Sequence, residues 1–303
     1  MNPTKLGARR RRLLVFVLFP FLALMSRPAF GQVDLSGSWA DRWHEDAPER
    51  DGGPEIGDYT GIPVNDAARM RADTWDAQKW EAVEHMCDPH PADYGPRGPA
   101  HMRVWSESDP FTQGVVAWHA TLRFMITQRI IYMDGRPHPS QNAPHTWQGF
   151  STGEWEGDML KVTTTHLKEG WFRRNGLARS DRATLIEYFI RHGDYFTLVT
   201  DVEDPIYATE PFIRTSNWIL DLGRQFPPRL VGCIPSVEVE HPEGYVAYHT
   251  LGENHFLGEF PSRWGVPAEA ARGGAETMYP EYQEKLAKMP APPRLPDHKV
   301  TKQ

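Results

Sequence analysis

The stretch "WQGFSTGEWEGDMLKVTTTH", from Trp147 to His166, decides the fold. Two runs of alternating residues flank Gly157-Asp158, and a glycine in the first turn position suits the two-residue turns of β-hairpins. This turn sets a register in which Glu154 lies opposite Lys161, and such an opposite-charge pair stabilises neighbouring strands. We therefore predict a β-hairpin in this register.

One face of the predicted hairpin carries large side chains at its ends and small side chains in its middle. Its members are Trp147, Gly149, Ser151, Gly153, Trp155, Leu160, Val162, Thr164 and His166. A packed core contains few voids, so small residues at its centre need a reason. Glycines permit bending or close approach of the backbone; alternatively, the small side chains leave space for a ligand. His166 opposite Gly149 favours the ligand, although a single inward histidine also occurs as a hydrogen-bonded core residue.

A second hairpin is expected from Arg182 to Pro205, with its turn near Gly193. Glu187 shares one face of this hairpin with apolar residues. A carboxyl group in apolar surroundings suits general acid or base chemistry. In the alternative interpretations, Glu187 pairs with an arginine such as Arg191, or the opposite face of the hairpin forms the core.

The rest of the chain fits the same fold class. Strand patterns separated by short turns run from Phe111 onward and predict an antiparallel meander. Helical residues follow the capping Asn65, so we expect a helical insertion near 65–85. Short C-terminal helices are expected at 268–272 and 282–289. We predict an all-β domain over residues 32–289, closing into a barrel or a strongly curved sheet, with a mobile tail at 290–303.

The N-terminal residues 1–31 have the pattern of a secretory signal peptide. Basic residues precede the apolar stretch Leu13–Met25, and small residues stand at Ala29 and Gly31. Cleavage is expected between Gly31 and Gln32, which places the mature chain in the periplasm or outside the cell. The residue directly after the cleavage site is Gln32 and not cysteine, so we expect no lipid anchor in the membrane.

The net charge indicates which partners the mature chain does not bind, and the two cysteines indicate a disulfide. Six of the 33 basic residues and none of the 40 acidic residues lie in the predicted signal, so the remaining chain has a formal charge of −13. This sign argues against nucleic acid as a partner. Cys87 and Cys233 would enter an oxidising compartment, and we predict that they form a disulfide.

No motif for an organic cofactor is present, and we expect none. The alternative is a histidine-bound zinc or copper ion. "HMCDPH", from His85 to His90, places potential ligands close together, and His119, His145 and His166 could converge from separate strands. However, the sequence lacks a metal-binding spacing such as H-E-x-x-H. "GFSTG" resembles a nucleophile elbow but lacks the helix that must follow one.

"IYMDGRPHP" (131–139) and "TWQGFSTGEWEGDMLKVTTTHL" (146–167) resemble motifs of a broad family of exported bacterial β-rich proteins with no established activity. "NDAARMRADTWD" (65–76) and "RGGAETMYPEY" (272–282) extend the resemblance over most of the mature chain. It implies a lipocalin-like barrel that begins near "GSW" (37–39). Many members of the family carry His at the position of Phe150 and Asp at that of Thr163, so chemistry that depends on those two groups is not expected here.

Three functional hypotheses follow. In the first, the barrel cavity binds a small, partly aromatic molecule, with these candidate lining residues: Tyr132, Trp147, Ser151, Trp155, Thr164 and His166. In the second, Glu187 with His166 or His145 catalyses a cofactor-independent lyase, isomerase or hydrolase reaction in that cavity. In the third, the chain is an envelope interaction protein with a packed core. The sequence does not specify an oligomeric state.

Overall fold

The computed structural model describes residues 32–42, 54–98, 101–122, 127–223, 233–236, 240–290 and 292–293. The described residues from Asp34 onward belong to one compact unit. The predicted signal peptide and most of the predicted tail lie outside the described residues. Within the described ranges, no helix has the length and apolar character needed to cross a membrane.

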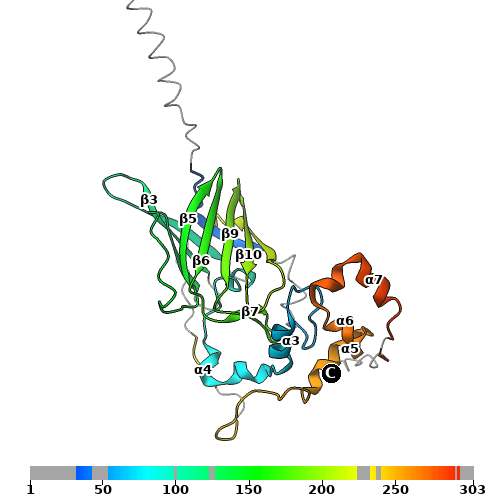
Figure 1. Cartoon of the computed structure of the whole chain (residues 1–303). Helices are drawn as coiled ribbons and strands as arrows, with labels where there is room; N and C mark the ends of the chain where they lie inside the picture. The colour runs from blue at the N-terminus through cyan, green and yellow to red at the C-terminus, as the bar shows by residue number, and fades with distance from the viewer. Residues whose placement is uncertain are drawn as a thin grey trace, which may run out of the picture. The chain divides into compact units, whose positions relative to one another are not determined.

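Nine strands form a closed barrel in the order β1-β11-β10-β9-β6-β5-β4-β3-β2 (Figure 1). The barrel strands are β1 (Gly37–Arg42), β2 (Met102–Ser108), β3 (Val115–Leu122), β4 (Thr127–Tyr132), β5 (Phe150–Glu156), β6 (Met159–Thr165), β9 (Thr184–His192), β10 (Tyr195–Glu203) and β11 (Phe212–Leu220). A separate ribbon pairs β7 (Gly170–Arg173) with β8 (Leu177–Arg179). The predicted all-β barrel is therefore confirmed.

Both predicted hairpins form. In β5–β6, Glu154 lies opposite Lys161 and Ser151 opposite Thr164, as the turn chemistry predicted. Gly157 in the turn has a φ of +66°, a conformation that glycine adopts without strain. In β9–β10, His192 pairs with Tyr195 across the turn at Gly193.

The predicted antiparallel meander is interrupted once. Strands β4 and β5 are parallel, with Ile131 next to Ser151 and Tyr132 next to Thr152. Parallel neighbours need a crossover connection, and residues 133–149 provide it. The antiparallel meander predicted from Phe111 onward did not include this crossover.

Tyr132, a predicted lining residue of the cavity, does not lie on the inner face of β4. Thr127, Arg129 and Ile131 are buried, whereas Ile130 is 43% exposed. Tyr132 shares the outward face with Ile130. Apolar residues therefore lie on both faces of this strand, and the barrel buries a charged group at position 129.

Aromatic side chains fill part of the barrel. The ring centroids of Trp39 and Phe196 are 5.1 Å apart, and those of Phe196 and Trp218 are 6.0 Å apart. All three side chains are almost completely buried. This packing closes off the interior around β1, β10 and β11.

The core continues beyond the barrel into the helical insertion. Helix α3 (Asp66–Asp73) begins after Asn65, whose side-chain oxygen accepts a hydrogen bond from Ala68 N at 3.1 Å. The 3₁₀ helix η1 (Ala77–Glu81) and helix α4 (Val83–Met86) follow, and they confirm the predicted insertion. Ala68 and Ala72 belong to a buried cluster that also contains Phe172 and Leu185. A further 3₁₀ turn, η2 (Gly95–Arg97), precedes β2.

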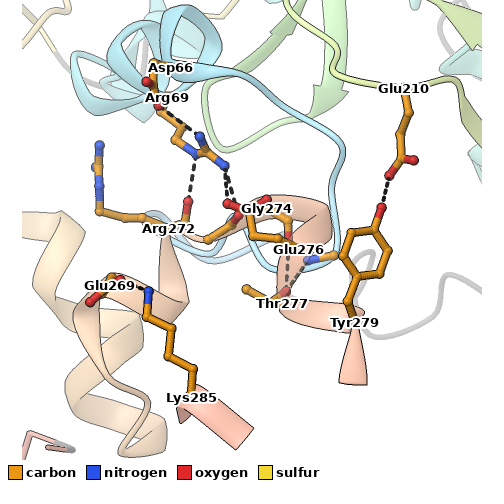
Figure 2. A network of polar contacts seen from close by, with 12 residues as sticks. Asp66, Arg69, Glu210, Glu269, Arg272, Gly274, Glu276, Thr277, Tyr279 and Lys285 are labelled. Atoms are coloured by element: carbon orange, nitrogen blue, oxygen red, sulfur yellow. Dashed lines mark hydrogen bonds and ion pairs between the residues drawn. The ribbon is translucent and has the colours of Figure 1, made fainter. Parts of the chain in front are cut away.

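The C-terminal segment consists of short helices held against α3. They are η4 (His255–Gly258), α5 (Glu259–Trp264), α6 (Ala268–Ala271), η5 (Gly274–Met278) and α7 (Pro280–Leu286). Arg69 donates to the carbonyl oxygens of Arg272 and Gly273, both at 2.8 Å, and pairs with Glu276 at 3.0 Å (Figure 2). These bonds satisfy carbonyl groups at the end of α6.

Candidate functional site

Four polar side chains meet inside the barrel. Arg129 forms an ion pair with Glu187 and donates from Nε to Ser151 Oγ at 3.1 Å. Its Nη2 also donates to Thr164 Oγ1 at 2.5 Å, and the two hydroxyl groups lie 2.9 Å apart. Strands β4, β5, β6 and β9 thus each contribute one residue to a buried polar cluster.

The structure corrects the expected partner of Glu187. Arg191 lies over the Trp39 ring at 5.2 Å and donates to Asp34 O at 2.6 Å. Glu187 is 0% exposed and pairs with Arg129 instead. The carboxylate is therefore held by the Arg129 guanidinium inside the barrel, away from His145 and His166.

Some polar atoms inside the barrel have no partner among the described residues. They include Glu187 Oε1 and the indole nitrogens of Trp118 and Trp155. Trp155 lies opposite Leu160, and Trp118 lies opposite Ile131, so both indoles are on the inner face. Buried polar atoms of this kind are commonly satisfied by water or a ligand.

The hairpin glycines do not leave vacant space, so that expectation was wrong. A Cβ atom at Gly153 would lie 2.6 Å from Met133 Sδ and 3.0 Å from side-chain carbons of Ile131 and Leu160. At Gly149, which has a φ of +64°, it would lie 2.5 Å from Thr165 O. Both glycines permit close approach, which is the alternative explanation of the same pattern.

His166 leaves the inner face predicted for it. Strand β6 ends at Thr165, and His166 has a φ of +58°, which breaks the strand alternation. Its Nε2 lies 2.8 Å from Ser140 O, and its ring centroid is 5.3 Å from that of His145. His145 Nδ1 contacts Leu167 O at 2.8 Å.

The predicted site residues therefore fall into separate groups. Ser151, Trp155, Thr164 and Glu187 lie inside the barrel. Tyr132, His145 and His166 belong to its outer wall and the crossover, where the Tyr132 ring is 5.3 Å from Phe150. A single cavity combining Glu187 with His166 or His145 as acid and base is not formed.

Trp147 joins an aromatic cluster that sequence reasoning did not identify. Its ring stacks on Trp171 at 6.3 Å, Trp171 lies 4.7 Å from Trp80, and Trp80 lies 5.7 Å from Trp75. Arg174 lies over the Trp80 ring at 4.2 Å, a cation–π contact. The high aromatic content was the available signal, but it could not show which tryptophans meet.

A cavity of about 280 Å³ lies beside this cluster, and we call it the strap pocket. The helical insertion forms one wall of this pocket, and the β7–β8 ribbon forms its floor. Residues 241–248 form the remaining side, and we call this segment the strap. The lining residues are Arg71, Thr74, Trp75, Asp76, Gln78, Lys79, Ala82, His85, Glu169, Gly170, Trp171, Gly176, Ala178, His241, Tyr245, Val246, Ala247 and Tyr248.

Two kinds of bond hold the strap over the pocket. The Tyr245 hydroxyl donates to Gln78 Oε1 at 2.5 Å, and His249 N donates to Thr74 O at 3.0 Å. The predicted disulfide Cys87–Cys233 is also present, with a Cα–Cα distance of 5.5 Å. Because Cys87 follows the helical wall and Cys233 precedes the strap, the disulfide covalently links these two parts of the chain.

The candidate metal ligands do not converge. His119 contacts Glu107 at 3.0 Å and stacks on Trp105, and His85 contacts Asp88 at 3.0 Å. Cys87 is committed to the disulfide. Within the part of the chain that the structure describes, no group of three or more His, Cys, Asp or Glu side chains is arranged to hold a metal ion.

Comparisons with protein-family models, curated proteins and solved structures gave no match. The geometry of the site is therefore the basis for assigning a function.

Proposed function

We propose that this protein binds a small, partly aromatic molecule in the strap pocket, outside the barrel. The observation that carries the proposal is the cavity itself, whose volume of about 280 Å³ is close to the lower end of the range for small-molecule sites. Its lining combines aromatic rings with a few polar groups, as such sites commonly do.

The aromatic part of the lining sets the class of ligand. Trp75, Trp171, Tyr245 and Tyr248 line the pocket. Aromatic rings favour offset stacking or edge-to-face contacts with other rings, so they select a planar, unsaturated group. Tyr248 is 54% exposed, so its side chain is available at the edge of the pocket.

The polar part of the lining adds affinity for a ligand that also carries a hydrogen-bond acceptor, whereas the aromatic ring is the requirement. Arg71 and Glu169 form an ion pair at the pocket. Trp75 Nε1 is buried and has no hydrogen-bond partner among the described residues. A ligand with an acceptor oxygen or nitrogen beside its ring would accept a hydrogen bond from this indole, which removes the cost of an unpaired buried donor.

We also propose that the chain acts in the periplasm or outside the cell. The N-terminal sequence pattern supports this location. The disulfide is compatible with an oxidising compartment.

Ligand titration tests the pocket, with indole as the aromatic probe and cyclohexanol as the non-aromatic one. Binding is followed by saturation-transfer NMR on the full mature chain. We expect indole but not cyclohexanol to bind, and Tyr245→Ala and Tyr248→Ala to weaken indole at least tenfold. Tyr195→Ala is the matched control, because Tyr195 lies on the barrel wall and is 48% exposed. Equal indole binding by all three variants would overturn the proposal.

A further inference from the structure

A continuous chain of polar contacts crosses the outer wall of the barrel. His138 Nε2 lies 2.9 Å from Thr152 Oγ1, and His138 Nδ1 lies 2.7 Å from Thr165 Oγ1. Thr165 Oγ1 is in turn 2.8 Å from His166 Nδ1, and His166 Nε2 is 2.8 Å from Ser140 O. Strands β5 and β6 position the threonines, and the crossover 133–149 supplies His138 and Ser140.

The donor and the acceptor of every hydrogen bond in this series follow from the contact between His166 Nε2 and Ser140 O. A carbonyl oxygen only accepts, so His166 Nε2 carries the hydrogen that it donates to Ser140 O. In the neutral ring, His166 Nδ1 is then an acceptor and receives the hydrogen of the Thr165 hydroxyl. Since that hydroxyl has one hydrogen, its oxygen accepts from His138 Nδ1.

The same reasoning completes the other end. With Nδ1 of neutral His138 protonated, its Nε2 accepts from the Thr152 hydroxyl. Burial lowers the pKa of His138, and the neighbouring His166 lowers it further, so the neutral ring that this assignment requires is favoured. All four bonds are satisfied by a single arrangement of hydrogens.

This arrangement matches the geometry of an activated nucleophile. A hydroxyl group that donates to an imidazole nitrogen, with the opposite ring nitrogen anchored by a third group, is the constellation used in nucleophilic catalysis. We propose that Thr165 is a nucleophile, that His166 is its general base, and that the site transfers the acyl group of small aryl esters to water. The Ser140 carbonyl orients His166, and His138 is a positioning residue that donates to the threonine oxygen.

The backbone at the site supports this assignment. His166 has a φ of +58°, which is uncommon for a residue other than glycine. Strain of this kind persists where the surroundings impose it and clusters at functional sites. Thr165, His138 and His166 are only partly buried, so the cluster lies at the surface of the barrel and not in its core.

The aromatic surroundings define the substrate class. The Phe150 ring lies 5.3 Å from the His138 ring and 5.3 Å from the Tyr132 ring. These rings offer faces and edges to an aryl group beside the reacting ester.

The proposed reaction has two steps. Thr165 Oγ1 bonds to the ester carbonyl carbon while its proton moves to His166 Nδ1, and collapse of the adduct breaks the carbon–oxygen bond to the aryl alcohol, which takes that proton. Water then attacks the acyl-threonine and gives its proton to His166. The acid is released, and the proton returns to Thr165 Oγ1.

The test uses 4-nitrophenyl acetate and the full mature chain. We expect an initial burst of 4-nitrophenol and an acetyl group on Thr165 in the peptide mass spectrum. Thr165→Ser keeps both signals, because the hydroxyl remains, whereas Thr165→Ala loses them. Thr163→Ala is the matched control, since Thr163 lies two residues earlier on the same outward face.

The two histidines give separate readouts. His166→Gln slows acylation at least 100-fold, because it removes the general base. His138→Gln leaves acetylation at Thr165 detectable but shifts the midpoint of the pH profile. The proposal is overturned if no acetyl group appears on Thr165, or if Thr165→Ala releases nitrophenol as fast as the unaltered chain. The indole titration tests the strap pocket separately, so failure of that proposal is distinguishable from failure of this one.

Discussion

Arg129 and Glu187 form an ion pair inside the barrel, although β5 and β6 lie between their strands in the wall. The pair reaches past two neighbouring strands, and Ser151 and Thr164 on those strands bind the same guanidinium. Buried charges are tolerated when they are paired and hydrogen-bonded in this way.

Removing one charge of this pair destabilises the fold strongly. Glu187→Ala leaves the Arg129 guanidinium buried without its counter-ion, and we expect a loss of about 3–5 kcal/mol in the free energy of unfolding. Urea denaturation measures this loss. The double variant Arg129→Met, Glu187→Leu should cost much less, because no charge stays buried. Glu156→Ala, which removes an exposed partner of Lys161, should cost less than about 1 kcal/mol. A Glu187→Ala cost as small as this control would contradict the prediction.

Gly153→Ala distinguishes close packing from vacant space. The added Cβ meets Met133, Ile131 and Leu160, so we expect a loss of about 1–3 kcal/mol in the free energy of unfolding. Gly258→Ala is the control, because a Cβ there has no neighbour within 4 Å. Thermal melts of both variants measure the difference. Unchanged stability of Gly153→Ala would show that space remains inside the hairpin.

The disulfide should hold the strap in place and so increase the affinity of the strap pocket for indole. Cys233 is exposed, so a small dithiol can reduce the bond and become a disulfide itself. Hydrogen exchange should then accelerate in residues 241–248 and stay unchanged in β9 and β10. Indole affinity should fall about tenfold, and Cys87→Ala with Cys233→Ala should reproduce both effects without reductant. Unaltered exchange in the strap after full reduction would show that its hydrogen bonds suffice.

His90 makes stability depend on pH. Burial lowers the pKa of His90 from its usual value of 6.5 to about 3, with Arg174 as a second cause. Between about pH 6.5 and about pH 3, His90 therefore binds a proton in the unfolded chain but not in the folded chain. The contribution of neutral His90 to the free energy of unfolding is fully present above about pH 6.5. It decreases as the pH falls through this window, by on the order of 5 kcal/mol at about pH 3.

His90→Phe removes the titrating group and keeps an aromatic ring beside Tyr94 and Trp171. Its free energy of unfolding should decrease less steeply between pH 6.5 and 4 than that of the unaltered chain, measured by urea denaturation at each pH. The slope is the readout, because the substitution also changes the absolute stability. Equal slopes would assign the acid sensitivity to other groups.

Local chemistry explains which parts of the fold were predictable. The Gly157-Asp158 turn and the charges of Glu154 and Lys161 act over a few residues, so the register of the first hairpin followed from them. Asn65 likewise marked the start of α3. By contrast, the parallel pairing of β4 with β5 depends on where residues 133–149 run, and no local pattern specifies that path.

The candidate sites show the same division. Strand alternation correctly placed Ser151 and Thr164 on the inner face, but it left open which face of the second hairpin, that of Glu187 or the opposite one, is buried. It failed at His166, because the strand ends one residue earlier and the backbone turns. The strap pocket was not predictable, since its walls combine residues 71–85, 169–178 and 241–248.

The sequence by itself determined the β-rich barrel class, the two hairpins, the helical insertion and the Cys87–Cys233 pair. These features follow from alternation, turn chemistry, helix capping and the presence of only two cysteines. Only the tertiary structure decided that Arg129 is the partner of Glu187, that the hairpin glycines are packed, and that the cavity lies under the strap. The physical reason is that burial and contact are set by segments far apart in the chain, whereas sequence patterns report on neighbours.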